Sequence, residues 1–598
     1  MSRGGLAAAA VLIGAVLGSV DNPSAAESSQ AGFVGLVPAR LVDTRVPGET
    51  VDGQARETGP LGADGVLTVP MLGRGGVPGS GVGAVALNVT AINPSAAGFV
   101  TVFPAGASRP NASNLNLDVG RTLPNTVIVP LGDGGAISIY NHTGVTDVAV
   151  DVLGWFPEGT TGSGPAPINP NPITTSRVSV VTGGAQATSL LGPVSVPDTG
   201  GSTDASISAD GRYVAFQSDA YDFDGLGSGG SSHVFVHDRH TVTTTRVSVT
   251  SSGERANGRS VNPSISADGR YVVFESNARN LADDSHEGFT DHVFVHDRHA
   301  GTTHHVSVAT DGTPGNHHSS DPSLSADGRY IAFRSHATNL VAGVTNGTDD
   351  VFVHDRVEGV TTRVSVGPGG AQADGPSGSP SISGNGRYVA FDSEATNLVP
   401  GDTNGVSDVF VHDRHTGVTT RVNLASDGTQ ADGGPFSNRG SVWPSISADG
   451  RYVAFHSLAA NLVPGDTNSE WDVFVRDRVA GVTTRVSVTS AGEQVNSGSQ
   501  RPSISADGRC VAFESWSQDL VPQETHGVVQ VYVHDRQTGI TGVASVASGG
   551  APAATYHAWR PTISADCGSI AFHSWASNLV PDDTNQVRDV FVFEQAVT

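Results

Sequence analysis

One short segment recurs seven times in the C-terminal two-thirds of the chain. Its fourth copy reads Pro380-Ser-Ile-Ser-Gly-Asn-Gly-Arg-Tyr-Val-Ala-Phe391. The copies follow one another at intervals of 58 to 64 residues, the length of one four-stranded blade with generous loops. The turn residue of each copy is Asp210, Asp268, Asp327, Asn385, Asp449, Asp507 or Asp566. The repeat therefore predicts an all-β chain with a seven-bladed β-propeller over residues 176–598.

Each copy predicts four strands. The segment Pro-Ser-Ile-Ser is the first, and Asp-Gly supplies the tight turn into Arg-Tyr-Val-Ala-Phe, the second. The third strand is Asp-Val-Phe-Val-His-Asp-Arg, and the fourth is Thr-Thr-Arg-Val-Ser-Val. Apolar residues occupy both faces of the second and third strands, so both faces must be covered. Blades that stack face to face around an axis provide that cover.

The motifs Ser-Ala-Asp-Gly-Arg-Tyr-Val-Ala-Phe and Val-Phe-Val-His-Asp-Arg resemble the WD40-like PD40 repeats of TolB-type propellers. The resemblance covers about 420 residues of the chain. It implies the propeller fold. It does not imply one function, because such propellers serve as binding platforms, as accessory domains of peptidases and as scaffolds of lyases.

The last copy ends after Asp589-Val-Phe-Val-Phe593 and lacks a fourth strand of its own. An isolated copy of that strand, Arg177-Val-Ser-Val180, precedes the first blade. We expect this segment to pair beside Val590–Phe593 and close the ring, so that no sheet edge is left bare.

The N-terminal third predicts three further segments. Residues 1–26 have the charged start, apolar run and small-residue end of a signal peptide, which indicates a secreted protein. Residues 31–157 alternate apolar stretches with Gly, Pro and Asn turns, which predicts a β-sandwich-like module. This module resembles one found in secreted actinobacterial proteins. Residues 158–175, rich in Gly, Pro, Thr and Asn, predict a flexible linker.

Net charge narrows the class of partner. The chain has a formal charge of −25 and no lysine, whereas proteins that bind nucleic acid need clustered cationic side chains. No stretch after the signal peptide approaches the ~20 apolar residues of a membrane helix. We expect a monomer whose partner is an extracellular carbohydrate, peptide or protein.

Three loops between the second and third strands carry acidic and amide side chains at a spacing that could hold Ca²⁺. Calcium is the one candidate cofactor, and the alternative is that these residues form Asx turns. The three sets are Asp402, Asn404 and Asp408; Asp466, Asn468 and Asp472; and Asp583, Asn585 and Asp589.

Histidine recurs at one place on the third strand. It stands there in five of the repeats, at His237, His296, His354, His412 and His534. The third strand lies roughly 10 Å further out than the first, so these side chains cannot meet at one metal ion. We expect them to be solvated.

Comparison of the repeats identifies two positions at which the copies differ. The first precedes the first-strand Pro or Ala and holds Asp204, Asn262, Asp321, Ser379, Trp443, Arg501 and Arg560. The second follows the second-strand Phe and holds Gln217, Glu275, Arg334, Asp392, His456, Glu514 and His573. Both sets are expected at the same end of the propeller, and we call that end the variable face.

Aromatic and guanidinium side chains gather at one sector of this face. They are the residue types most enriched among energetic anchors of binding sites. The candidate ligand-binding residues are Phe436, Arg439, Trp443, Arg501, Tyr556, Trp559 and Arg560, with Asp204 and Asp321 on the same rim.

These residues favour a non-catalytic binding or scaffold protein, because the chain has no Gly-x-Ser-x-Gly elbow and no His-Glu-x-x-His motif. One alternative is a propeller glycosidase or polysaccharide lyase that uses a carboxylate pair, Glu275 with Asp392 or Asp321 with Glu514. A second alternative is a structural module of the cell envelope, which would have a featureless variable face.

The two cysteines fall at equivalent ends of adjacent blades. Cys510 replaces the tyrosine after the turn of the sixth copy, and Cys567 replaces the turn glycine of the seventh. A disulfide between the two blades and two free buried thiols are both compatible with this placement.

Overall fold

The computed structural model describes residues 34–595 except 47, 49, 56–57, 108, 110–114, 118, 158–173, 188–200, 221–222, 224–230, 283–289 and 435–439. The predicted signal peptide and nearly all of the predicted linker lie outside these residues. The chain divides into two compact units near residue 169, each described by itself below. No helix in the described part of the chain is long and apolar enough to cross a membrane.

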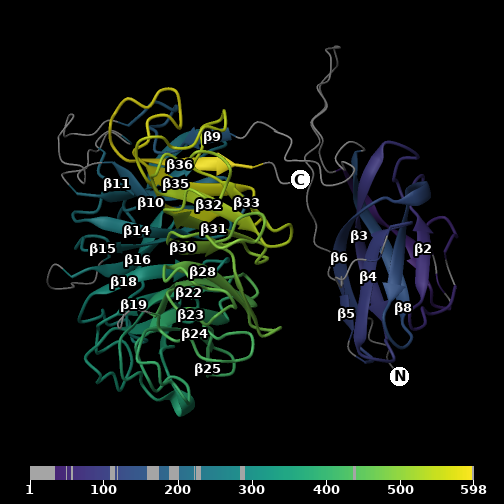
Figure 1. Ribbon diagram of the computed structural model, residues 1–598, viewed down its shortest axis with the longest axis horizontal. Helices are drawn as coiled ribbons and strands as arrows, with labels where there is room; N and C mark the ends of the chain where they lie inside the picture. The colour runs from purple at the N-terminus through teal and green to yellow at the C-terminus, as the bar shows by residue number, and fades with distance from the viewer. Residues whose placement is uncertain are drawn as a thin grey trace. The chain divides into compact units, whose positions relative to one another are not determined.

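The first unit is a sandwich of two four-stranded antiparallel sheets (Figure 1). Their inner faces share one core that includes Leu41, Val85 and Ile139. One sheet has the order β1 (Val34–Asp43), β8 (Asp147–Pro157), β3 (Val82–Ile92) and β6 (Leu123–Pro130). The other has the order β2 (Val66–Pro70), β7 (Ala136–Asn141), β4 (Gly98–Pro104) and β5 (Leu115–Leu117).

The described residues of the second unit form seven four-stranded antiparallel sheets, which we number blades 1 to 7 (Figure 1). Blade 1 contains β10 (Ser202–Ile207), β11 (Tyr213–Ser218), β12 (His233–Asp238) and β13 (Thr243–Arg246); blade 2 contains β14 (Ser260–Ile265), β15 (Tyr271–Ser276), β16 (His292–Asp297) and β17 (Thr302–His305). Blade 3 contains β18 (Ser319–Leu324), β19 (Tyr330–Ser335), β20 (Asp350–Asp355) and β21 (Val360–Arg363); blade 4 contains β22 (Ser377–Ile382), β23 (Tyr388–Ser393), β24 (Asp408–Asp413) and β25 (Val418–Arg421). Blade 5 contains β26 (Ser441–Ile446), β27 (Tyr452–Ser457), β28 (Asp472–Asp477) and β29 (Val482–Arg485); blade 6 contains β30 (Ser499–Ile504), β31 (Cys510–Ser515), β32 (Gln530–Asp535) and β33 (Ile540–Val543). Blade 7 contains β34 (Ala558–Ile563), β35 (Ser569–Ser574), β36 (Asp589–Glu594) and β9 (Thr174–Arg177).

The blades stack in chain order and close into a ring. The first strand of each blade packs against that of the next, so these strands line the axis, and β10 of blade 1 packs against β34 and β35 of blade 7. The stacked faces are apolar: each core cluster joins residues of two adjacent blades, such as Val389 and Phe391 of blade 4 with Val351 and Val353 of blade 3. The all-β propeller fold predicted from the repeat is therefore confirmed.

Local chemistry fixes each turn between the first and second strands. In blade 1, Asp210 Oδ1 accepts hydrogen bonds from the Ser208 hydroxyl (2.6 Å) and the Arg212 amide (3.0 Å). Gly211 follows with φ of 70°, a conformation that glycine adopts without steric cost. The guanidinium of Arg212 then pairs with both carboxylate oxygens of Asp238 on β12, at 2.9 and 2.7 Å. This end of the ring carries two short hairpins in each of blades 1 to 6 and one in blade 7, and the variable face is the opposite end.

The ring is closed by a strand from the N-terminal side of blade 1, as the sequence predicts, but the register differs. Strand β9 begins at Thr174 and pairs Thr175 with Phe593 and Arg177 with Phe591. The predicted strand, Arg177–Val180, is displaced by three residues, and the predicted boundary at residue 176 falls inside β9. Val178 still donates a backbone hydrogen bond to Val590 at 2.8 Å.

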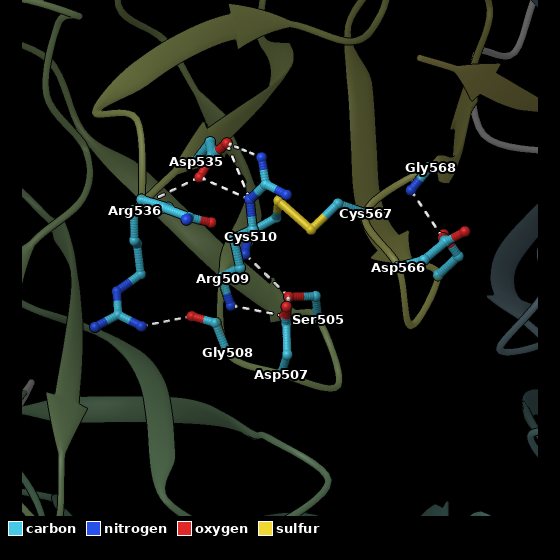
Figure 2. The surroundings of a disulfide bond; sticks show 12 residues. Ser505, Asp507, Gly508, Arg509, Cys510, Asp535, Arg536, Asp566, Cys567 and Gly568 are labelled. Atoms are coloured by element: carbon cyan, nitrogen blue, oxygen red, sulfur yellow. Dashed lines mark hydrogen bonds and ion pairs between the residues drawn. A yellow bond between two sulfur atoms is a disulfide. The ribbon is translucent and has the colours of Figure 1, made fainter. Parts of the chain in front are cut away.

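A disulfide joins blades 6 and 7. Cys510 and Cys567 have Cα atoms 5.9 Å apart and form a bond across the interface (Figure 2). On the other side of blade 7, Arg239 of blade 1 pairs with Glu594 at 2.7 Å. The last blade is thus held by a covalent bond on one side and an ion pair on the other.

Candidate functional site

Each first strand of the ring contains a β-bulge. In blade 1 the pairing passes from Thr203–Gln217 to Ser206–Ala215, so two residues oppose one. The first residue of every bulge is left-handed, with φ between 47° and 54°: Asp204, Asn262, Asp321, Ser379, Trp443, Arg501 and Arg560. None is glycine. Such a conformation costs roughly 1–3 kcal/mol per residue and often marks functional sites.

The preceding blade supports each bulge through a side chain. The backbone amide of Trp443 donates to Asp392 Oδ2 at 3.0 Å, and that of Asp321 donates to Glu275 Oε1 at 2.7 Å. The same contact joins Asn262 to Gln217, Arg501 to His456, Arg560 to Glu514, and Asp204 to His573. The two variable positions found by comparing repeats are therefore one structural unit, because one supplies the amide and the other its acceptor.

The exception lies between blades 3 and 4. Arg334 stands at the acceptor position, and a guanidinium cannot accept a hydrogen bond. It turns instead to two carboxylates, Asp321 at 3.4 Å and Asp349 at 3.5 Å. Gly378 of blade 4 lies beside Arg334 and has no side chain to crowd it. A Cβ at Gly378 would lie 3.2 Å from Arg334 Cδ.

A pocket of about 380 Å³ opens on the variable face at this exception. The first strand of blade 4 has small residues, Gly378 and Ser379, at the two positions where blade 5 has Val442 and Trp443. The lining residues come from blades 3 to 6: Arg334, Asp349, Pro376, Ser377, Gly378, Asp392, Ser393, Glu394, Ser407, Val442, Trp443, His456, Trp471, Gln500 and Arg501.

Three aromatic side chains line the pocket, those of Trp443, His456 and Trp471. Trp443 is 42% exposed, and the Arg501 guanidinium lies 5.0 Å from its ring centre. Trp471 meets the His456 ring edge-to-face at 4.8 Å. An exposed indole offers an apolar face and one N–H donor to a ligand.

His456 is 4% exposed and neutral, because burial lowers its pKa to about 3. Its Nδ1 accepts from the Arg501 amide at 3.4 Å, so the ring proton is on Nε2. Among the described residues Nε2 has no hydrogen-bond partner. The pocket therefore holds a nearly buried donor available to a ligand.

Three carboxylates also line the pocket, those of Asp349, Asp392 and Glu394. Asp349 pairs with Arg334, and Asp392 accepts the Trp443 amide. Burial raises the pKa of Asp392, although the hydrogen bond from the Trp443 amide lowers the pKa in part. Glu394 is exposed, and no ion-pair partner for it occurs within the described residues.

The structure divides the predicted ligand-binding residues into groups. Trp443 and Arg501 line the pocket. Arg560 instead forms a hydrogen-bonded ion pair with Asp204 across the interface between blades 7 and 1, and Asp321 pairs with Arg334. Phe436 and Arg439 lie outside the described residues.

Tyr556 and Trp559 each contact other aromatic side chains of blades 6 and 7. Trp559 contacts Trp516, with ring centres 6.0 Å apart, and Tyr556 lies 6.5 Å from Trp575. Neither residue lines the pocket. Among the described aromatic residues of the predicted set, Trp443 alone lines this pocket.

The sequence-based list of ligand-binding residues omits Arg334, Asp392 and His456, although all three belong to the second variable set. It also omits Trp471, which directly precedes the third strand of blade 5. The signal for Trp471 was present, because the equivalent residues in blades 4 and 7 are Ser407 and Arg588.

The predicted calcium loops are ion-pair sites. Arg421, at the end of the fourth strand, reaches Asp402 at 3.2 Å and Asp408 at 3.4 Å, and Asn404 donates its amide to Asp408. The other two loops have the same arrangement, Arg485 with Asp466 and Asp472, and Arg177 with Asp583 and Asp589, while Asn468 and Asn585 donate to the nearby aspartate. The guanidinium supplies the positive charge that calcium would supply. Across the described residues no group of three or more His, Cys, Asp or Glu side chains could hold a metal ion.

The third-strand histidines are buried, not solvated as predicted. His412 is 6% exposed, and its Nδ1 lies 3.0 Å from the Thr419 hydroxyl, which itself donates to the Val366 carbonyl of blade 3. The other four make the same contact to Thr244, Thr303, Thr361 and Thr541. The prediction failed because the outer strands of adjacent blades also pack together.

No family model and no curated protein matches the chain. Among solved structures it is similar to a putative TolB from Agrobacterium tumefaciens, at 18% identity and a TM-score of 0.30, over 48% of this chain and 79% of that chain. It is similar to TolB from Acinetobacter baumannii at 15% identity and a TM-score of 0.31, over 57% of this chain and 62% of that chain. It is also similar to an oligogalacturonate lyase in complex with manganese at 13% identity and a TM-score of 0.40, over 71% of this chain and 96% of that chain. All three TM-scores are 0.40 or lower, so the propeller assignment rests on the strand order of this chain, and nothing about its ligand follows from these structures.

Proposed function

We propose that the protein is a secreted, non-catalytic binding protein that holds a carbohydrate in the pocket of the variable face. The observation that carries this proposal is an exposed Trp443 beside the unpartnered Nε2–H of His456. Sugar rings present an apolar face that stacks on aromatic side chains and a rim of hydroxyl groups that accept hydrogen bonds. A volume of about 380 Å³ suits one or two such rings.

The charge of −25 supports an extracellular ligand over nucleic acid, and the predicted signal peptide supports secretion. A cell-envelope module without a ligand would have no need of a built pocket.

The experiment is a glycan array probed with the mature chain, followed by titration calorimetry on the best ligand. Trp443→Ala should abolish binding while the unfolding midpoint stays within ~2 °C of wild type, because Trp443 is exposed. Tyr556→Ala is the matched control, since Tyr556 is 54% exposed on the same face but outside the pocket. Equal loss in both variants, or no ligand on the array, would overturn the proposal.

A second candidate function is glycoside cleavage, which one observation favours. Burial raises the pKa of Glu275 to about 7, a value suited to a general acid. Its Oε1 accepts from both Asn262 and the Asp321 amide, which also explains the side chain as a support of the bulge. Glu275 is 4% exposed and does not line the pocket, so this function requires a glycan that reaches the bulge of blade 3. Product release that disappears in Glu275→Gln would support it.

A further inference from the structure

The two cations of the pocket are already neutralised. Arg334 lies between Asp321 and Asp349, and Arg501 lies 3.5 Å from Glu514 while its guanidinium covers Trp443. An anionic ligand would have to compete with these carboxylates for each guanidinium. The arginines therefore do not make the pocket selective for acids.

The carboxylates, in contrast, are not all neutralised. Glu394 is exposed at the pocket and has no ion-pair partner within the described residues. Asp392 has one oxygen on the Trp443 amide, a neutral donor. Glu394 thus faces the pocket without a cation of its own, and Asp392, whose pKa is raised by burial, offers oxygen acceptors beside it.

The net charge of the whole protein also favours a cationic ligand. With a net charge of −25, the protein attracts cations to its surface and repels anions. A low-dielectric pocket wall strengthens this preference close to the carboxylates.

Two neutral features fix the remainder of the ligand. The Nε2–H of His456 can donate to a ligand oxygen, and the part of the Trp443 ring that Arg501 leaves exposed offers an apolar surface. A ligand with these properties has hydroxyl groups, an apolar ring face and one positive charge.

We propose that the pocket selects a hexosamine with a free, protonated amine, with Glu394 and Asp392 receiving the ammonium group and His456 donating to a hydroxyl oxygen. This inference rests on the proposed carbohydrate-binding function and adds the charge of the sugar.

The test compares four methyl β-glycosides by calorimetry at pH 6 with the full mature chain. They are glucosaminide, N-acetylglucosaminide, glucoside and glucuronide, which share a ring and differ in charge at one substituent. We expect the glucosaminide to bind about tenfold more tightly than the glucoside, the effect of one charge-assisted hydrogen bond, and the glucuronide to bind least. Equal or tighter binding of any of the other three overturns the inference but leaves carbohydrate binding intact. If none of the four binds, or if binding is unchanged in Trp443→Ala, both this inference and the proposed carbohydrate binding are overturned.

Variants separate the amine contact from the general field. Glu394→Gln should remove most of the preference for glucosaminide over glucoside while affinity for the glucoside is retained. Glu358→Gln makes the same change of charge in the hairpin at the opposite end of blade 3 and should leave the preference unchanged. A preference that survives Glu394→Gln, or that falls equally in both variants, contradicts the assignment. Triglycine amide carries an amine without hydroxyl groups, and binding as tight as the glucosaminide would show that the sugar is not recognised.

Discussion

Cys510 and Cys567 join blades 6 and 7 at the two positions where a tyrosine and a glycine meet at the five preceding interfaces. Between blades 1 and 2, for example, a Cβ on Gly269 would lie 2.2 Å from the ring of Tyr213. The residue without a side chain makes room for the ring. The disulfide replaces both partners at once, so the covalent bond occupies the space of a ring contact.

Removing the disulfide should weaken the ring. Cys510→Ser with Cys567→Ser is expected to lower the free energy of unfolding by roughly 2–4 kcal/mol, since the bond closes a long loop in the unfolded chain. Cys510→Tyr with Cys567→Gly should recover part of this loss, because it restores the pair found elsewhere and relieves the φ of 69° at residue 567. Urea denaturation measures all three proteins. An unchanged wild-type midpoint in excess reductant would contradict the first expectation.

The buried histidines should make stability depend on pH. Burial lowers the pKa of His412 to about 4, below the ~6.5 of the unfolded chain. Its contribution is therefore complete above pH 6.5 and is lost as pH falls from 6.5 toward 4, because the unfolded state binds the proton first. His412→Asn keeps a donor to Thr419 but does not titrate, so it should reduce the loss of stability between pH 7.5 and 4.5 by about 2 kcal/mol.

The control for that variant is His415→Asn, which removes an exposed histidine three residues away. Chemical denaturation at the two pH values gives the comparison. If His415→Asn and His412→Asn change the pH dependence equally, the buried contact to Thr419 is not the cause.

Deleting β9 should leave β36 as a bare edge. We expect a chain that lacks residues 174–180 to aggregate at micromolar concentration and to unfold at a clearly lower temperature, since an open edge pairs with other chains. Light scattering and calorimetry measure these two effects. A deletion of residues 160–169, which ends before β9, serves as the control and should leave both unchanged.

Filling the pocket should abolish binding without unfolding the protein. Gly378→Val places in blade 4 the residue that blades 2 and 5 carry at Val261 and Val442. The new Cβ would press on the flexible Arg334 side chain, so we expect a cost of at most ~1–2 kcal/mol and loss of glycan binding. Calorimetry with the array ligand tests the second part, and undiminished affinity would show that the ligand binds elsewhere.

The sequence predicts the propeller well because the same turn and strand pattern occurs in all seven copies of the repeat. The Asp-Gly turn, the apolar strands and the missing fourth strand of the last copy suffice for the ring and its closure. The register of β9 was missed by three residues because Thr174–Arg177 and the segment after it are both compatible with an outer strand.

The site was harder to predict because it depends on contacts between blades. Comparison of the repeats identified both variable positions, yet it could not show that one donates to the other across an interface. It also gave no reason to pair Asp402, in the loop before β24, with Arg421, at the end of β25. The pocket itself depends on what Gly378 and Ser379 lack, and missing side chains give no signal in a list of candidate binding residues.

The bulge has a consequence for how such a surface can change. Six of the seven rim residues are held in their unusual backbone conformation by an amide contact, which every amino acid except proline can make. The neighbouring blade supplies the acceptor, so the identity of the rim side chain is free to vary. At these positions the side chain that meets a ligand is separate from the amide that supports the bulge. Mutation can exchange Trp, Arg, Asp or Ser at seven places around the axis, and a combinatorial library confined to those seven codons would sample new specificities on an unaltered scaffold.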